Sequence, residues 1–320
     1  MTIVYDPSAM YRFDDGLLPY VGSFPAADLG DATSLAATRR QVTEAIAERD
    51  VDWSGVSVTT ELAGTAGADA ATRVAVYRPT DIAGPWPVMV YFHGGGFVLA
   101  DERSEDPLLT RLVRELGIAI VSVGYRLAPE HPCPAALDDG CTALHWCAET
   151  ATAQGFDPDR LGVGGRSAGA ALAAGVALAT GDAIPLRFLY LGEPVLDPRL
   201  ATASMREMDD TPVWRRRDAE QSWALYLGGR GLAELPSYAA PATHTPLDGL
   251  PPTYLTANEI DPLRDEAVAF LTRLLAAGVP TEFHLYPGAF HGAMSFAAPL
   301  AERMFGDLAG ALRRGLVDGY

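Results

Sequence analysis

The sequence contains no lysine: all 24 of its basic residues are arginine, against 41 aspartates and glutamates. The formal net charge is −17 at pH 7. Nucleic acids and anionic membrane surfaces bind clustered cations, so this charge balance predicts that neither is a partner. Without lysine, the chain also has no side-chain amine that could form a Schiff base with a carbonyl substrate.

Cysteine is scarce, and long apolar runs are missing. The three cysteines, Cys133, Cys141 and Cys147, cannot close a disulfide framework, and their odd number indicates free thiols in a reducing compartment. Residues 1–20 have no basic segment ahead of an apolar stretch, so they do not resemble a secretory signal. No uncharged apolar run approaches the length that crosses a membrane. We therefore expect a cytoplasmic protein without membrane insertion.

Short apolar runs and helical stretches alternate through most of the chain, which at 320 residues can bury a large core. Two early runs, 56–60 and 73–77, predict an antiparallel pair of strands. The later runs are apolar enough for strands covered on both faces, and they lie at 87–92, 118–123, 161–163, 186–191, 253–257 and 281–286. Helical stretches lie at 107–116, 135–150, 263–277 and 300–316. This order predicts an α/β fold with a mostly parallel sheet flanked by helices, which binds ligands at the carboxyl ends of its strands.

Two segments lack the strand rhythm. Residues 1–50 carry a helical stretch at 34–48, and the interval at about 200–248 has a helix-like stretch at 206–227 followed by a proline-rich loop. We interpret 51–320 as one catalytic domain with a helical insertion at about 200–248, and we expect the insertion and residues 1–50 to form a cap over the site. The run Arg215-Arg216-Arg217 is interpreted as a solvated helix face.

The turn Gly165-Arg166-Ser167-Ala168-Gly169 separates an apolar run from an alanine-rich helical stretch at 170–180. A G-x-S-x-G pentapeptide in this context is typical of a serine nucleophile, because side chains at the glycines would crowd the turn that lifts the hydroxyl out of the sheet. The start of the following helix favours the negative charge that forms on an attacked carbonyl. By itself, the pentapeptide also fits a Gly-Ser loop that caps a helix.

A nucleophilic serine needs a base to take its proton and an acid to orient that base. His291 is the best candidate for the base among six histidines, because it follows the last predicted strand in a glycine-rich turn. The weaker candidates are His284 within that strand, His244 in the insertion and His145 in a helix.

The acid should lie between the serine and the histidine in chain order. Asp261 follows the predicted strand 253–257 and fits this order, although an aspartate before a proline is also a good helix cap. Glu259 and Asp265 remain alternatives.

Gly94-Gly95-Gly96 follows the run at 87–92 and offers backbone N–H groups that no side chain obstructs. The N–H group of Ala168, directly after the serine, is a further donor for an oxyanion. A phosphate loop is excluded because no Lys-Ser/Thr pair follows the glycines. The spacing Gly162-x-Gly164 does not make a dinucleotide fingerprint, since Ser167 stands where the third glycine belongs.

Taken together, these motifs resemble the bacterial hormone-sensitive-lipase-like carboxylesterases of the α/β-hydrolase fold, from about residue 56 to the C-terminus. The motifs are His93-Gly94-Gly95-Gly96-Phe97, Tyr125-Arg126-Leu127-Ala128-Pro129-Glu130-His131-Pro132, Gly165-x-Ser167-Ala168-Gly169, Asp261-Pro262-Leu263-Arg264-Asp265-Glu266 and His291-Gly292. The resemblance implies Ser167 as nucleophile, His291 as base and Asp261 as its partner, with the oxyanion held by Gly95, Gly96 and Ala168. It also implies a cap, short- to medium-chain acyl esters as substrates, and a homodimer through the last strand.

Two positions depart from the pattern of that family. Arg166 stands where aspartate or threonine is usual, and Glu193-Pro194 replaces Tyr-Pro. We favour an ion pair between Arg166 and Glu193, since buried charges are normally matched; a charged substrate that faces Arg166 is the alternative. A zinc site among the histidines and cysteines of 131–147 is rejected, because the segment has no C-x-x-C spacing.

The expected reaction is acyl transfer through an acyl-enzyme, without a cofactor or a metal. Phe97 and Trp214 are expected to line an apolar acyl pocket. Amidase, deacetylase and lactone-hydrolase activities on the same scaffold remain alternatives, since leaving-group choice depends on pocket shape. A small-molecule receptor with this fold is a further alternative, against which the complete Ser, Asp and His set argues.

Overall fold

The computed structural model describes residues 11–23, 27–64 and 71–319, and its centre is one eight-stranded sheet. The strand order is β1-β2-β4-β3-β5-β6-β7-β8. β1 pairs antiparallel with β2 and β2 with β4, while all other neighbours are parallel. The strands are β1 (Val56–Ala63), β2 (Thr72–Pro79), β3 (Trp86–Phe92), β4 (Ala119–Gly124), β5 (Phe156–Arg166), β6 (Phe188–Gly192), β7 (Thr253–Ile260) and β8 (Thr281–Phe290). The predicted fold class, including the antiparallel pair at its start, is confirmed.

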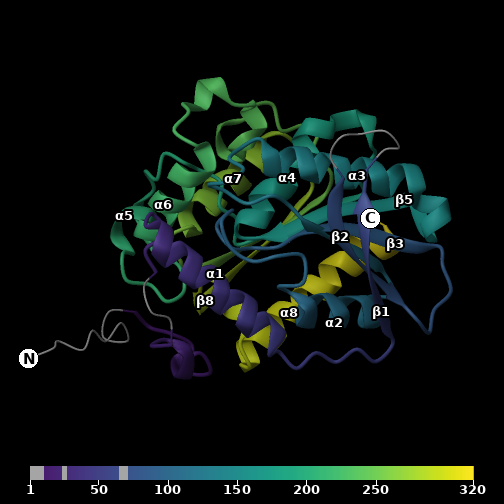
Figure 1. The fold of residues 1–320 in the computed structure, drawn as a ribbon, viewed down its shortest axis with the longest axis horizontal. Helices are drawn as coiled ribbons and strands as arrows, with labels where there is room; N and C mark the ends of the chain where they lie inside the picture. Colours follow the sequence, from purple (N-terminus) through teal and green to yellow (C-terminus); the bar gives the residue numbers. More distant parts are fainter. Residues whose placement is uncertain (1–10, 24–26, 65–70, 320) are drawn as a thin grey trace, which may run out of the picture.

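Helices cover both faces of the sheet (Figure 1). They are α1 (Ala32–Ala47), α2 (Asp106–Leu116), α3 (Ala135–Gln154), α4 (Ala168–Thr180), α5 (Ala203–Glu207), α6 (Arg216–Leu227), α7 (Arg264–Ala276) and α8 (Pro299–Leu312), which continues as a π-helical turn over Arg313–Asp318. Helices α3, α4 and α7 pack against one face, and α2 and α8 pack against the other.

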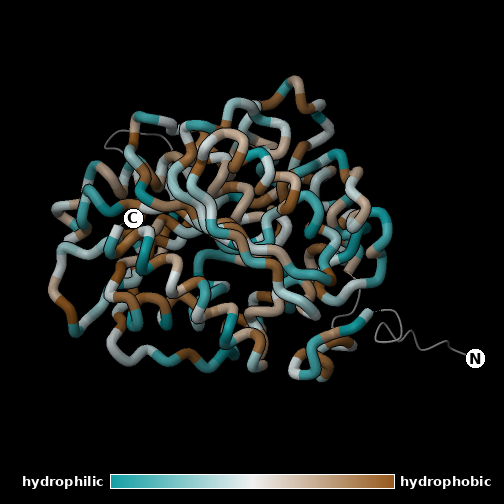
Figure 2. Tube along the Cα trace, turned by 180° about the vertical axis from the view of Figure 1, so that it is seen from behind, coloured by the Kyte–Doolittle hydropathy of each residue, from teal (hydrophilic) through white to brown (hydrophobic). Residues whose placement is uncertain are grey.

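β3 shows why this chain forms such a sheet. Val88, Val90 and Phe92 point into the core under α3 and α4, whereas Met89 and Tyr91 point into the core under α2 and α8. Successive side chains of a strand face opposite sides, so a strand covered on both sides needs the continuous apolar run that the sequence has. Figure 2 shows hydrophobic and hydrophilic residues alternating along much of the trace, with hydrophobic segments among the strands at its centre.

The insertion between β6 and β7 differs from its prediction. The expected helical stretch at 206–227 is broken, because α5 ends at Glu207 and α6 begins at Arg216. Pro212 explains the break, since proline has no N–H and disfavours a helical residue before it. Val213 then has a φ of 66°, in the left-handed region.

The segment before β1 is hydrogen-bonded to the insertion. Leu29 N donates to Gln221 Oε1 at 2.9 Å, and Arg217 Nη2 lies 2.5 Å from Asp28 Oδ2. Of the run Arg215-Arg216-Arg217, which was predicted to be a solvated helix face, Arg217 is exposed and the other two are half-buried; Arg217 also pairs with the N-terminal segment. Residues 1–10, 24–26 and 65–70 lie outside the described residues. They include part of the segment 1–20 that was compared with a secretory signal, part of the predicted cap segment 1–50, and the turn after β1. Within the described residues, no helix is long and apolar enough to cross a membrane.

Candidate active site

Ser167 lies between β5 and α4 with a φ of 55° and a ψ of −122°. A non-glycine residue at positive φ is strained and must be held by its surroundings. Its N–H donates to the carbonyl of Gly192 at 2.8 Å. A Cβ on Gly165 would lie 2.5 Å from the carbonyl oxygen of Phe92, and one on Gly169 would overlap the same atom. The turn thus needs both glycines because the backbone at the end of β3 passes directly against it.

The structure brings together the three predicted catalytic side chains. Nε2 of His291 lies 2.9 Å from Oγ of Ser167, and Nδ1 of His291 lies 2.8 Å from Oδ2 of Asp261. The exposed fractions are 6% for Ser167, 5% for His291 and 1% for Asp261. With Nδ1–H donating to Asp261, Nε2 is the nitrogen that can accept the serine proton.

Asp261 combines the two roles that its position in the sequence suggested. Its Oδ1 accepts the N–H of Leu263 at 2.9 Å, just before α7, while Oδ2 faces His291. The alternative acids are engaged elsewhere: Glu259 accepts the N–H of Gly288, and Asp265 accepts that of Ser204.

The other candidate histidines have other partners. His284 faces Glu282 and Asp307, Nδ1 of His145 lies 2.8 Å from the carbonyl of Cys141, and Nδ1 of His244 lies 2.8 Å from Oγ of Ser237.

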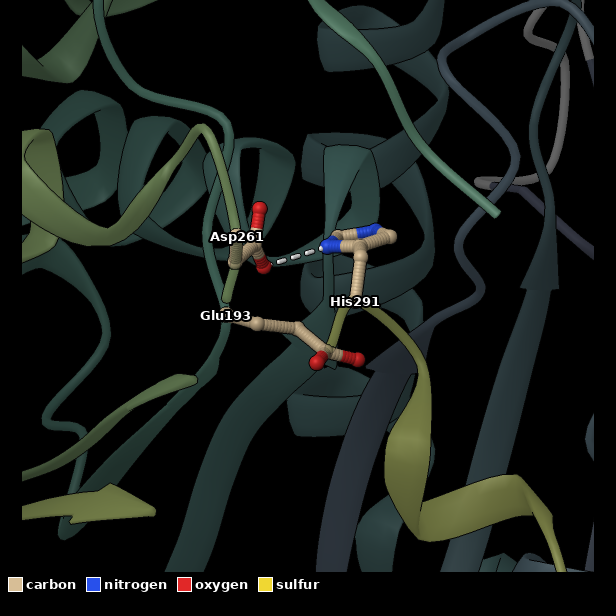
Figure 3. A group of neighbouring side chains, drawn as sticks. All are labelled: Glu193, Asp261 and His291. Carbon is tan, nitrogen blue, oxygen red and sulfur yellow. Dashed lines mark hydrogen bonds and ion pairs between the residues drawn. The ribbon is translucent and has the colours of Figure 1, made fainter. Parts of the chain in front are cut away.

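One group of side chains in the described ranges has donor atoms close enough together to hold a metal ion: Glu193, Asp261 and His291 (Figure 3). Arg166, Asn258 and the N–H of Gly292 already donate to the Glu193 carboxylate, and His291 pairs with Asp261. These contacts suit a hydrogen-bonded carboxylate better than a metal ligand.

The glycine loop after β3 lies beside the serine. A Cβ on Gly94 would be 3.4 Å from Cβ of Ser167, and Gly95 and Gly96 have φ values of 119° and 60°. Within 71–319, the N–H groups of Gly95, Gly96 and Ala168 donate to no protein acceptor. Unpaired N–H groups next to a serine can hold the oxygen of an attacked carbonyl.

Three elements hold this loop in place. Ser222 of α6 donates its hydroxyl to the carbonyl of Gly96 at 2.6 Å, and Arg39 of α1 donates to the carbonyl of Val98 at 2.8 Å. Tyr125 donates to the carbonyl of His93 at 2.9 Å and stacks on the His93 ring. Sequence reasoning did not identify Ser222, because nothing near it in the chain suggests a contact with residue 96.

The two predicted lining residues lie in different places. Trp214 covers the loop: a Cβ on Gly96 would be 2.6 Å from its Cη2 atom, and its ring centre is 5.8 Å from that of His291. The Phe97 ring stacks on Tyr226 at 4.1 Å and is 1% exposed. Trp214 thus borders the site directly, whereas Phe97 packs the loop against α6.

Arg166 and Glu193 form the predicted ion pair, with Nη2 2.7 Å from Oε1 and both side chains buried. Arg166 also donates to Oγ of Ser295 at 3.0 Å and lies 3.5 Å from Glu105. Burial raises the pKa of Glu193, but Arg166 and His291 outweigh this effect and leave the pKa below its usual range. Glu193 is therefore a charged carboxylate near His291.

Burial lowers the pKa of His291, but the Asp261 and Glu193 carboxylates raise it by more, so the net shift is upward. The site thus favours the imidazolium form that results when the histidine takes a proton. A serine, a histidine and an aspartate aligned at the carboxyl edge of a parallel sheet are the arrangement found in serine hydrolases.

Comparison with known proteins agrees with this class. Residues 89–295 match a family described as having the alpha/beta hydrolase fold. Carboxylesterase NlhH of Mycobacterium tuberculosis is 38% identical over 261 residues, which cover 79% of this chain and 82% of the relative. An ethyl acetate hydrolase of Pseudomonas putida is 31% identical over 239 residues, or 72% of this chain and 73% of the relative. The solved structure of a bacterial heroin esterase superposes with a TM-score of 0.89 at 40% identity, covering 95% of this chain and 98% of that one.

The chain belongs to the α/β-hydrolase family, among the carboxylic ester hydrolases that are similar to hormone-sensitive lipase.

Proposed function

We propose that this carboxylesterase works through Ser167 as nucleophile, His291 as general base and Asp261 as the acid that orients the histidine. The observation that carries the proposal is the buried chain of contacts from Oγ of Ser167 to Nε2 of His291 at 2.9 Å, and from Nδ1 of His291 to Oδ2 of Asp261 at 2.8 Å.

The proposed reaction has two half-steps. Oγ of Ser167 attacks the ester carbonyl while its proton moves to Nε2 of His291, and the carbonyl oxygen becomes an oxyanion held by the N–H groups of Gly95, Gly96 and Ala168. The imidazolium then protonates the leaving alkoxide, and an alcohol departs from an acyl-enzyme. Water then attacks the acyl carbonyl while His291 takes its proton; the bond from the acyl carbon to Oγ breaks, the imidazolium returns the proton to Ser167, and the carboxylic acid departs.

A burst assay with a series of p-nitrophenyl esters, combined with titration by an organophosphonate, tests the mechanism. We expect stoichiometric labelling of the wild type, and we expect Ser167→Ala to lose turnover and labelling together. Ser57→Ala, on the exposed face of β1, is the matched control and should keep both. A wild-type protein that neither turns over nor labels would contradict the mechanism and favour the receptor alternative.

For the substrate, we propose short- to medium-chain acyl esters. Support comes from Trp214, which lies against Gly96 and 5.8 Å from the His291 ring, where its indole would limit the length of an acyl chain, and one relative is named for ethyl acetate. Trp214→Ala should raise the ratio of octanoate to acetate hydrolysis by roughly tenfold, since each methylene in an apolar pocket is worth about 1–3 kcal/mol. An unchanged ratio would remove Trp214 from the acyl pocket. Anilides and lactones in the same panel distinguish the esterase from amidase and lactone-hydrolase activities.

We also propose that residues 1–50 and the insertion at about 200–248 form the cap. Support comes from Arg39 and Ser222, which reach the glycine loop from these two segments. If they form a cap, Ser222→Ala should lower kcat without unfolding the protein. An unchanged kcat would leave the insertion without a role at the site.

For assembly, we propose a homodimer through β8, which is the outer strand on its side of the sheet and carries the exposed Leu285. A second copy paired along this edge would extend the sheet. Sedimentation velocity tests the proposal, and a monomer at micromolar concentration would contradict it.

The free thiols of all three cysteines support a reducing, cytoplasmic location.

A further inference from the structure

Three charged side chains, of which Arg166 and Glu193 are buried and Glu105 is half-buried, connect the turn that carries His291 with the glycine loop. Glu105 stands at the start of α2, Arg166 directly before the nucleophile, and Glu193 just after β6. Arg166 lies between the two carboxylates, with Nη2 2.7 Å from Oε1 of Glu193 and Nη1 3.5 Å from Oε2 of Glu105. None of the three takes part in the proton and acyl transfers described above.

Glu193 holds the turn that carries His291. Its Oε2 accepts the N–H of Gly292 at 3.0 Å and a hydrogen bond from the side-chain amide of Asn258. The same amide donates to the carbonyl of Phe290 at 2.9 Å. The peptide groups on both sides of His291 are therefore fixed by one carboxylate–amide pair. In Figure 3 the Glu193 carboxylate ends beside His291, with no dashed line to its ring.

Glu105 holds the glycine loop. Its Oε1 accepts the N–H of Gly94 at 3.3 Å, and its Oε2 accepts the hydroxyl of Tyr91 at 2.6 Å. Gly94 directly precedes Gly95, the first of the proposed oxyanion donors. Because Arg166 contacts both carboxylates, the loop and the histidine turn share one cation.

The charges around His291 add to this geometry. Asp261 faces it from the end of β7, Glu193 from the end of β6, Arg166 from the end of β5 and Asp218 from α6. The Glu193 carboxylate raises the pKa of His291 by more than the Arg166 cation lowers it. A buried anion within a few ångströms favours a cationic form of its neighbour.

We propose that Glu105, Arg166 and Glu193 are positioning residues. Glu193 holds the turn that carries His291 and stabilises the imidazolium that forms when Ser167 loses its proton. Glu105 holds the glycine loop. The inference rests on the proposed function of Ser167 and His291. The three residues exchange no proton with the substrate, because the serine proton goes to His291 and then to the leaving alcohol.

The test compares variants that change the charge on opposite sides of His291. Glu193→Gln removes an anion and should move the titration of His291 to lower pH by roughly one to three units. Arg166→Gln removes a cation, keeps a donor for Glu193, and should move the titration to higher pH. The titration is followed by NMR of the His291 ring and by the acid limb of kcat/KM. Glu282→Gln removes a comparable carboxylate beside His284 and is the matched control.

The opposite directions in which the two variants should shift the titration of His291 distinguish a positioning role from simple structural support. A purely structural role would lower the folded fraction in each variant and leave the titration of His291 in place, and shifts in the same direction or no shifts would overturn the proposal. If Glu193→Gln fails to fold, Arg166→Gln carries the test alone, with an upward shift expected. The NMR titration needs no turnover, so failure of the proposed esterase mechanism is seen separately.

Glu105→Gln tests the other end of the network. We expect kcat to fall at least about tenfold, because the neutral amide weakens the charge-assisted hydrogen bonds from Gly94 and Tyr91, with KM nearly unchanged and the titration of His291 in place. A change in KM alone, with kcat preserved, would remove Glu105 from the proposal.

Discussion

Two histidines at the β8 end of the sheet face acidic residues in opposite surroundings. His284, within β8, has a side chain that is 31% exposed and lies 3.2 Å from both Glu282 and Asp307. His291, just after β8, has a side chain that is 6% exposed and lies 2.8 Å from Asp261. The residue types are the same, but one group is in contact with water and the other is in the interior.

The difference shows that a pairing of histidine and acid is not by itself a catalytic site. Water screens charges at the edge strand, whereas the interior strengthens them. The hydrogen bond from Nδ1 to Asp261 also fixes the orientation of the buried His291 ring, and the strained turn places the Ser167 hydroxyl at Nε2 of that ring. Among the described residues, His284 contacts tyrosines and acids and no serine hydroxyl.

Exchanging each histidine for glutamine should produce the largest difference between the two regions. His291→Gln should lower kcat by about 10⁴-fold or more, since the loss of one triad member costs that much. His284→Gln should change kcat less than twofold. Steady-state kinetics on a p-nitrophenyl ester measures both, with circular dichroism to verify folding. Comparable losses in the two variants would mean that the edge cluster takes part in the reaction.

Adding one methyl group distinguishes the two regions by packing. A Cβ on Gly169 would overlap the carbonyl oxygens of Phe92 and His93, and these are backbone atoms that cannot turn aside. Gly169→Ala should therefore cost about 3 kcal/mol or more of unfolding free energy. Gly306 on α8 has no atom within 4 Å of an added Cβ, so Gly306→Ala should stabilise by up to about 1 kcal/mol. Denaturant unfolding measures both changes, and equal values would contradict the tight approach of β3 to the turn.

The sequence allowed most of the buried region to be predicted. Parallel strands end at one edge of a sheet, so Ser167, Asp261 and His291, each after a predicted strand, had to lie near each other. The pentapeptide predicts a tight turn that side chains at its glycines would crowd, and the structure adds that the backbone at the end of β3 lies against them.

The rest depends on contacts between distant segments. Glu105 reaches Arg166 across 61 positions of the chain, and Ser222 reaches Gly96 across 126. No local pattern marks such residues, since the sequence around each resembles that around an ordinary Glu or Ser on the surface of a helix. The break between α5 and α6 is different, because Pro212 marks it in the sequence and lies within the stretch 206–227 that was predicted to be helical.

The pH dependence of activity should report the buried histidine alone. Its pKa is raised by Asp261 and Glu193, which outweigh the effect of burial, so the neutral base is lost at a pH above the usual range for histidine. We expect kcat/KM to fall about tenfold per pH unit below that pKa. For stability the sign is opposite: a raised folded-state pKa stabilises below the unfolded pKa, and this stabilisation is lost as pH rises through the folded pKa. An acid limb below the ordinary range would contradict the net shift.

The smallest expected effect belongs to the edge region. Glu282 lies 2.6 Å from Arg314 and 3.2 Å from His284, with all three side chains more than a quarter exposed. Exposed ion pairs contribute about 0–1 kcal/mol, and salt screens them further. Glu282→Gln should therefore change the unfolding free energy by less than about 1 kcal/mol, and by still less at high ionic strength. Breaking the buried Glu193–Arg166 pair by Glu193→Gln should cost several times more, roughly 3–5 kcal/mol, because Arg166 keeps its charge in the interior. Denaturant unfolding of the two variants at low and high salt measures the difference, and equal costs would mean that burial does not separate the two regions.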